Sequence, residues 1–133
     1  MITTRTRLTI FLSLLLLSAC INPETNRKET KLVTLTIHYG KAQPPRTVTT
    51  PLIKGQTVLA LLQAAAEIET ETIDAYIVVT SIDGVKSTRG KMAWYYKIDG
   101  TYADQLASNK TLHQETHIEW LYQADTCSES MYD

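Results

Sequence analysis

The chain has 133 residues, of which 44% are hydrophobic and 20% charged, and its formal net charge is −1. This length fits one compact domain with a modest core and leaves little room for a second. Because 13 basic residues stand against 14 acidic ones, the chain lacks the basic face that nucleic-acid binding requires, and we expect no nucleic-acid partner.

The first segment, residues 1–19, has the layout of a bacterial lipoprotein signal peptide. Arg5 and Arg7 precede an apolar run, residues 8–17, that is too short for the roughly 20 apolar residues of a membrane-spanning helix. Ser18 and Ala19 then form a small-residue cleavage site directly before Cys20. We therefore expect the mature chain to begin at Cys20, which would carry a lipid on its sulfur. The alternatives are an uncleaved anchor and an ordinary secretory signal, and both would still export the chain.

Residues 20–31 follow as the lipidated cysteine and a polar tether. From Asn22 to Lys31 the chain is polar and charged without any apolar period, so it has no face to bury. Two or three acyl chains on Cys20 would hold a small domain at a bilayer almost permanently. We expect a membrane partner and a place in the cell envelope, in the outer membrane if the source is Gram-negative.

The folded domain is predicted over residues 32–123, and it begins with a hairpin and a helix. Residues 32–39 alternate apolar and polar side chains, which is the period of a half-buried strand. Residues 47–50 form a second, threonine-rich strand before Pro51. Residues 58–67 then place apolar side chains at helical spacing, after a threonine that can cap the first turn, Thr57.

Three further strands are predicted at residues 76–82, 92–98 and 116–122, each rich in β-branched or aromatic side chains. Asp-Gly turns follow the first two, and residues 103–109 form an irregular crossing. This order predicts the α+β class, with a β-grasp-like mixed sheet and one packed helix. The rival arrangement is an all-β sandwich with an added helix, and it needs more strands than the sequence predicts.

Residues 124–133 are predicted to be a polar tail that contains the second cysteine, Cys127. With Cys20 committed to lipid, no disulfide within the chain is available. Cys127 is therefore either an idle thiol or a link to another chain.

Four sequence blocks resemble the bacterial domains that are similar to the C-terminal domain of transcobalamin and intrinsic factor. The blocks are Thr57–Leu62, Val79–Gly84, Ala93–Gly100 and Ile118–Tyr122 with Leu112 before it. The resemblance covers about residues 32–122 and implies a β-grasp-like fold. For the eukaryotic relatives it also implies a cap over a corrinoid, so cobalamin or a related corrinoid is the one cofactor it suggests.

Aromatic side chains are dense in the predicted domain. On a strand, Trp94 and Tyr96 share one face and Tyr95 shows the other. Tyr95, Tyr102 and Trp94 are our candidates for stacking a flat apolar ligand or a partner side chain. The competing interpretation is core filling, in which Trp94 and Trp120 back the helix.

A metal site is a weaker alternative, because His113, Glu115, His117 and Glu119 alternate along one segment. Four ligands on one extended strand cannot surround a tetrahedral ion without help from elsewhere, so we assign no metal. The chain contains none of the common nucleophile, phosphate-loop or metalloprotease motifs, and we expect no enzymatic activity.

The predicted function is that of an envelope-anchored, non-catalytic binding module for a small hydrophobic ligand or for a protein partner in a membrane complex. The alternative is a structural or adhesion scaffold that works by protein–protein contact.

Overall fold

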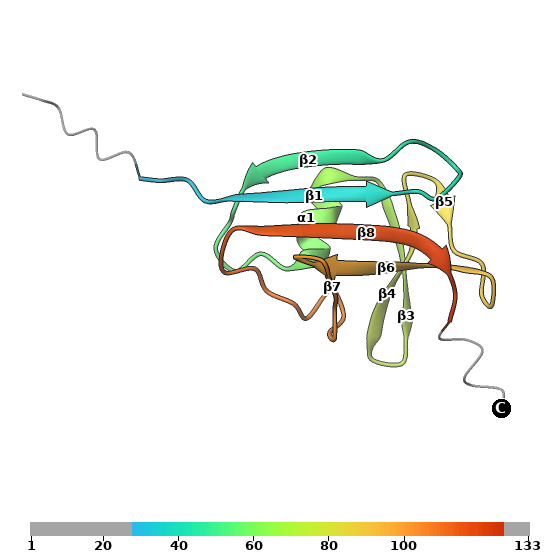
Figure 1. Cartoon of the computed structure of the whole chain (residues 1–133). Helices are drawn as coiled ribbons and strands as arrows, with labels where there is room; N and C mark the ends of the chain where they lie inside the picture. The colour runs from blue at the N-terminus through green and yellow to red at the C-terminus, as the bar shows by residue number, and fades with distance from the viewer. Residues whose placement is uncertain (1–27, 127–133) are drawn as a thin grey trace, which may run out of the picture.

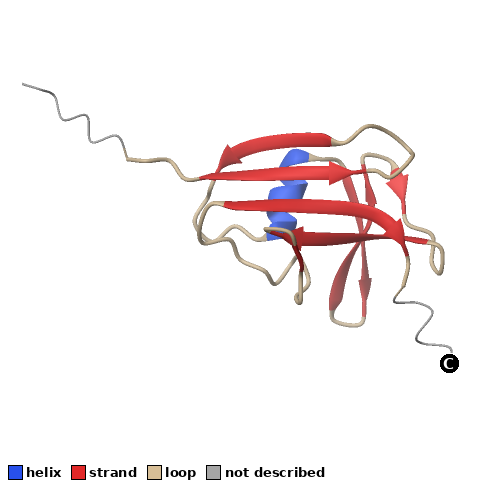
Figure 2. Ribbon diagram, in the orientation of Figure 1, coloured by secondary structure: helices blue, strands red, loops and turns tan. Residues whose placement is uncertain are grey.

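The computed structural model describes residues 28–126, which form eight strands and one short helix (Figures 1 and 2). No helix in this part of the chain is long and apolar enough to cross a membrane. The elements are β1 (Leu32–His38), β2 (Arg46–Pro51), α1 (Val58–Ala65), β3 (Ile68–Ile73), β4 (Tyr76–Ile82), β5 (Val85–Lys86), β6 (Met92–Ile98), β7 (Thr101–Tyr102) and β8 (Thr116–Ala124).

Five strands form a large mixed sheet in the order β2-β1-β8-β6-β7. The β1–β8 pair is parallel, with Val33 opposite Thr116, and the other pairs are antiparallel. Helix α1 lies against one face of this sheet (Figure 1). A mixed sheet with one helix was predicted and is present, whereas the β-grasp assignment stays a prediction.

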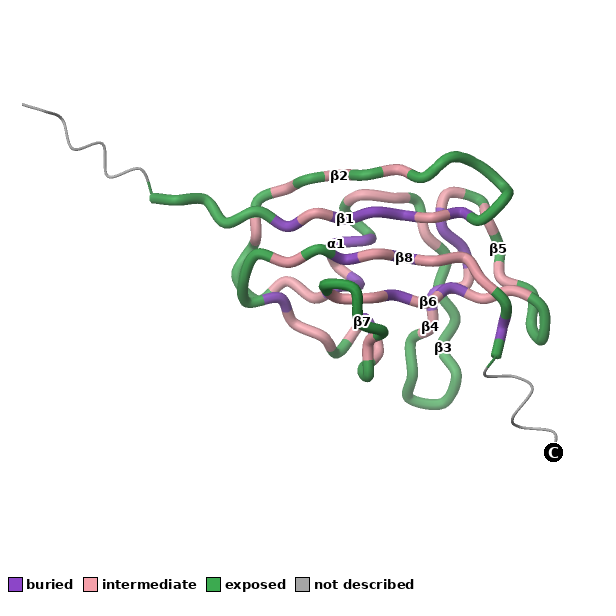
Figure 3. The backbone as a smooth tube through the Cα atoms, in the orientation of Figure 1, coloured by how far each residue is buried: buried purple, intermediate pink, exposed green. Residues whose placement is uncertain are grey.

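The core lies between α1 and the face of the large sheet that it covers (Figure 3). Val33, Leu35 and Ile37 alternate along β1 with less buried residues, and all three are at most 1% exposed. Leu61 and Leu62 meet them from α1. Trp94 and Trp120, the two residues interpreted as core filling, are also buried, and so are Tyr96 and Ile118.

Helix α1 begins where the sequence predicts and ends two residues early. The Thr57 side chain accepts a hydrogen bond from the Ala60 N–H at 3.1 Å, so the predicted cap is confirmed. The helix ends at Ala65 rather than at residue 67, because Ala66 is already extended and leads into β3.

A second sheet, in the order β3-β4-β5, is absent from the sequence prediction. Strand β3 was missed because its inner residues are alternating glutamate and threonine, and all but its first residue are exposed. A strand that is exposed to solvent on both faces has no alternation of hydrophobic and polar residues. The strand count that favoured a single sheet over a sandwich was therefore wrong.

Both predicted Asp-Gly turns are confirmed. Asp83 and Gly84 join β4 to β5, and Asp99 and Gly100 join β6 to β7, with all four residues at positive φ. Two residues at positive φ make the tight hairpin turn that Asp-Gly favours. The short partner strands β5 and β7 were not predicted.

Smaller differences concern the ends of strands. Pro51 is the last residue of β2, where it pairs with Leu32, rather than the residue that stops the strand. Strand β8 continues to Ala124. The predicted signal peptide, the predicted lipid-attachment residue Cys20, and Cys127 all lie outside the described residues.

Candidate functional site

A groove with a volume of about 1000 Å³ separates the β3–β4 hairpin from the edge of the large sheet. One wall is formed by β3 and β4, and the other by β6, β7, the crossing after β7 and the end of β8. Figure 1 shows the hairpin projecting away from the large sheet. Five aromatic side chains line this aromatic groove, namely Trp94, Tyr95, Tyr96, Tyr102 and Trp120.

All three residues proposed as ligand contacts from the sequence, Trp94, Tyr95 and Tyr102, line this groove. They come from two strands, β6 and β7, that pair at one end only. Trp94 is only 7% exposed, so it belongs to both the core and the groove wall. The two interpretations of Trp94, as core and as contact surface, are therefore compatible.

Tyr95 is fixed in place by the segment that follows β8. Its hydroxyl donates to the Asp125 carboxylate at 3.3 Å and accepts from the Thr126 N–H at 3.2 Å. The other Asp125 oxygen accepts from the Gly90 N–H at 2.8 Å. Asp125 is 8% exposed, although the sequence places it in a polar tail. The sequence offers no signal for this role of Asp125 beyond its position directly after β8, because a single aspartate belongs to no recognisable motif.

Tyr102 is the most accessible aromatic side chain of the groove, with 52% of its surface exposed. Its hydroxyl donates to the side-chain oxygen of Gln123 at 2.9 Å. The Lys97 ammonium lies 4.6 Å from the centre of the Tyr102 ring, so a cation–π interaction covers one face of this ring.

Deeper in the groove, Tyr96 and Trp120 stack with ring centres 5.1 Å apart. The Tyr96 hydroxyl donates to the Gln105 carbonyl at 2.5 Å. Burial, together with the nearby Asp104 carboxylate, raises the pKa of Tyr96, so this hydroxyl stays protonated. The buried indole N–H of Trp120 has no hydrogen-bond partner among the described residues.

The base of the β3–β4 hairpin is tied to the large sheet through Asp83. Its carboxylate accepts from the Tyr39 hydroxyl, from Arg46 at 2.8 Å and from the Glu67 N–H at 3.1 Å. Burial by itself would raise the pKa of Asp83, but these hydrogen bonds and the Arg46 charge together lower it. Sequence reasoning assigned Asp83 only a turn, because its partners lie 16 to 44 residues away.

Replacing Asp83 by asparagine should lower the free energy of unfolding by about 2 kcal/mol at neutral pH. Asparagine tolerates the positive φ of this position, so the change removes charge and acceptor capacity rather than the turn. Because the pKa of Asp83 is lowered on folding, its contribution is present above the usual value of 3.8 and is lost as the pH falls further. Urea unfolding at neutral pH and at about pH 3 measures both effects.

Asp99→Asn is the matched control for this change. Asp99 occupies the same Ile-Asp-Gly context at positive φ, but within residues 28–126 its side chain accepts only a backbone N–H, from His117 at 2.9 Å. We expect it to cost less than about 1 kcal/mol. Equal losses in the two variants would show that the Asp83 network adds nothing beyond the turn.

The proposed metal-ligand series does not lie along one strand. Strand β8 begins at Thr116, so His113 and Glu115 precede it. His117 contacts Thr36 at 2.9 Å and Glu119 contacts His38 at 3.2 Å, both across the β1–β8 pair. Within residues 28–126, no three His, Cys, Asp or Glu side chains gather closely enough to hold a metal ion.

Comparisons with known proteins give one family and several similar structures, of which two are described below. The family model described as "Domain of unknown function (DUF4430)" matches residues 55–124, which is more than half of the chain. Comparison with curated protein sequences gives no match.

One similar structure is a protein from Ruminococcus gnavus described as a "putative metal binding protein". It is 12% identical, with a TM-score of 0.61 over 71% of this chain and 98% of that chain. The other is haptocorrin in complex with Cbi, which is 13% identical, with a TM-score of 0.57 over 70% of this chain and 25% of haptocorrin. This chain therefore corresponds to a quarter of haptocorrin, and both likenesses concern the fold, which is transcobalamin-like.

Proposed function

The chain belongs to the DUF4430 family, and we propose that it is a non-catalytic binding module whose aromatic groove holds a flat, largely apolar small molecule. The observation that carries the proposal is the groove itself, about 1000 Å³ in volume and lined by five aromatic side chains. Ligand sites in proteins are typically apolar clefts of roughly 300–1,000 Å³ with a few polar groups that orient the ligand. Aromatic rings offer flat, rigid contact area of this kind.

The polar groups of the groove suit recognition better than chemistry. The Asp125 carboxylate is engaged by the Gly90 N–H and the Tyr95 hydroxyl, so it holds a groove residue in place. Because the pKa of Tyr96 is raised, its hydroxyl stays protonated and donates a hydrogen bond to the Gln105 carbonyl. These contacts support a rigid binding wall and supply no activated nucleophile.

A corrinoid is the first ligand to test. The transcobalamin-like fold supports this choice, because haptocorrin, with a similar domain, is solved in complex with Cbi. Three quarters of haptocorrin have no counterpart in this chain, so a corrinoid would have to be held by this one domain. Metal binding, the property named for the Ruminococcus protein, is not carried over, because the described residues offer no cluster of ligands.

The proposal places this module at the cell envelope through a lipid on Cys20, with the β-grasp-like domain held by residues 20–31. The support is the sequence of residues 1–20, whose short apolar run ends in Ser-Ala-Cys. In a Gram-negative source the expected membrane is the outer one.

Replacing Tyr102 by alanine should weaken ligand binding at least tenfold. The ring is half exposed, so its loss removes contact area without opening the core. Titration of the purified chain with cobinamide, cobalamin and haem, followed by tryptophan fluorescence and calorimetry, measures the effect.

Tyr76→Ala is the control, because Tyr76 is 57% exposed and does not line the groove. We expect its affinity to equal that of the unaltered chain. Binding that both variants lose equally would place the ligand elsewhere. If none of the three ligands gives heat or a spectral change, the small-molecule proposal is wrong and a protein partner becomes the first candidate.

A protein partner is the second candidate, and one observation favours it. Ile73, Tyr76 and Ile77 expose 50%, 57% and 39% of their surface at the tip of the β3–β4 hairpin. Exposed apolar side chains gathered at one point are typical of interaction sites. This candidate corresponds to a scaffold or adhesion role, and a pull-down from solubilised membranes that is lost in Tyr76→Asp, at a residue that does not line the groove, would support it.

A further inference from the structure

One end of the domain, where the chain enters β1, exposes two large apolar side chains. Leu32 is 45% exposed, and Ile53 is 61% exposed, more than any other large hydrophobic side chain among the described residues. The two are neighbours because Leu32 pairs with Pro51 and the Leu52 N–H donates to the Lys31 carbonyl at 2.8 Å. We call this surface, residues 28–32 and 52–55, the entry end.

Exposed lysines flank these apolar residues in the chain. Lys28, Lys31 and Lys54 are all exposed, and none of them takes part in the ion pairs found within residues 28–126. The carboxylates in the same region are Glu29 and Glu115, the latter beside the residue that pairs with Val33. The entry end thus carries an excess of positive charge on a chain whose net charge is −1.

We propose that the entry end rests on the surface of an anionic lipid bilayer, with Ile53 and Leu32 among the headgroups. Small apolar anchors flanked by lysines suit such a surface, because the apolar side chains enter the interface and the ammonium groups meet lipid phosphates. This inference rests on the lipid attachment included in the proposed function.

The number of residues between Cys20 and Leu32 favours a lipid bilayer as the partner of the entry end. Cys20 lies twelve residues before Leu32. A random-coil chain of this length would span about 20 Å on average, and a fully extended one about 40 Å. A lipid on Cys20 therefore keeps the bilayer within reach of the domain, and the segment joins the domain at the entry end.

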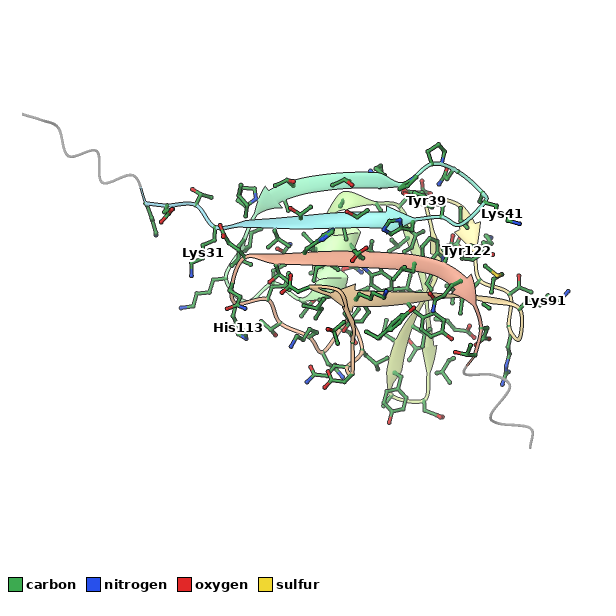
Figure 4. All side chains as sticks on the ribbon, viewed as in Figure 1. Lys31, Tyr39, Lys41, Lys91, His113 and Tyr122 are labelled. Carbon is green, nitrogen blue, oxygen red and sulfur yellow. The ribbon has the colours of Figure 1, made fainter. Side chains whose placement is uncertain are left out.

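In this orientation the Asp125 end of the groove faces away from the bilayer. Figure 4 shows Lys31 and His113 at one end of the domain and Lys41 and Lys91 at the other. The Asp125 N–H donates to the Lys91 carbonyl at 3.0 Å, so the Asp125 end of the groove lies far from Lys31. A ligand could then enter from the aqueous side while the protein stays on the membrane.

The test compares Ile53→Trp with Ile73→Trp, since both positions are exposed isoleucines and they lie on different parts of the domain. The chain from Cys20 onward, with Cys127→Ser, is coupled through Cys20 to a maleimide lipid in phosphatidylcholine–phosphatidylglycerol vesicles. Brominated lipids then quench tryptophan at the bilayer surface, and the chain without a new tryptophan supplies the background of Trp94 and Trp120. We expect quenching at position 53 to be several-fold stronger than at position 73.

Equal quenching at the two positions, or stronger quenching at position 73, would overturn the proposal. Charge is tested by adding Lys31→Glu and Lys54→Glu, which should reduce the quenching at position 53, whereas Lys41→Glu at the other end should not. Chemical coupling makes the result independent of acylation in the cell. Membrane fractionation of the protein produced in cells tests the proposed lipid attachment separately.

Discussion

Replacing Cys20 by serine should move the protein from the membrane fraction to the soluble fraction almost completely. Serine cannot accept the thioether-linked lipid, and each buried methylene of an acyl chain contributes about 0.8 kcal/mol to membrane binding. Two long chains therefore hold the protein nearly irreversibly, while the entry end alone gives only weak, salt-sensitive attraction. Fractionation of cells with a high-salt wash, together with metabolic labelling by palmitate, measures the change.

The control for this experiment is Cys127→Ser, which removes the other cysteine and should leave both fractionation and labelling unchanged. A Cys20→Ser protein that remains membrane-bound after the salt wash, with unchanged processing of residues 1–19, would contradict the lipoprotein assignment. Labelling that is lost from Cys127→Ser instead would mean that the lipid has been assigned to the wrong cysteine.

Replacing Trp94 by alanine should lower the free energy of unfolding by about 3–5 kcal/mol. The side chain is 7% exposed and connects the two sheets, because its indole N–H donates to the Val85 carbonyl at 2.9 Å. Its ring also meets Tyr39 edge-on at 5.9 Å and Tyr122 at 5.1 Å. A domain of ordinary stability has about 5–15 kcal/mol, so this loss is large.

Trp94→Phe separates the ring from its hydrogen bond. Phenylalanine keeps most of the apolar contact and loses the N–H to Val85, so we expect a cost of about 1–2 kcal/mol. Denaturant unfolding at neutral pH measures both variants. If alanine costs no more than phenylalanine, the buried ring adds nothing beyond its hydrogen bond to Val85, and the core role of Trp94 is wrong.

All the elements predicted from the sequence except β2 bury one face, and β2 was predicted from its run of threonines. Strands β1, β6 and β8 and helix α1 all place apolar residues toward one core, and burial of one face produces the period of 2 or 3.6 that sequence analysis detects. Thr57 and the two Asp-Gly pairs were predictable because their roles depend on neighbours in the chain.

The groove could be predicted only in part. Tyr95 and Tyr102 were singled out because strand alternation and loop position leave them away from the core. The opposite wall comes from β3 and β4, and β3 has no hydrophobic period to reveal it. The contacts of Asp83 and Asp125 depend on how distant segments meet in space, and no local pattern encodes such meetings.

The most direct test of the central claim, that this family member holds a small apolar ligand in its aromatic groove, is chemical-shift mapping with cobinamide. We predict that the largest backbone amide shifts on titration fall at Tyr95, Tyr102 and Gln123, which line the groove. Threonines on β1 and β2, at the other edge of the large sheet, such as Thr34 and Thr49, should stay unchanged. Shifts confined to that other edge, or no shifts at saturating cobinamide, would contradict the claim.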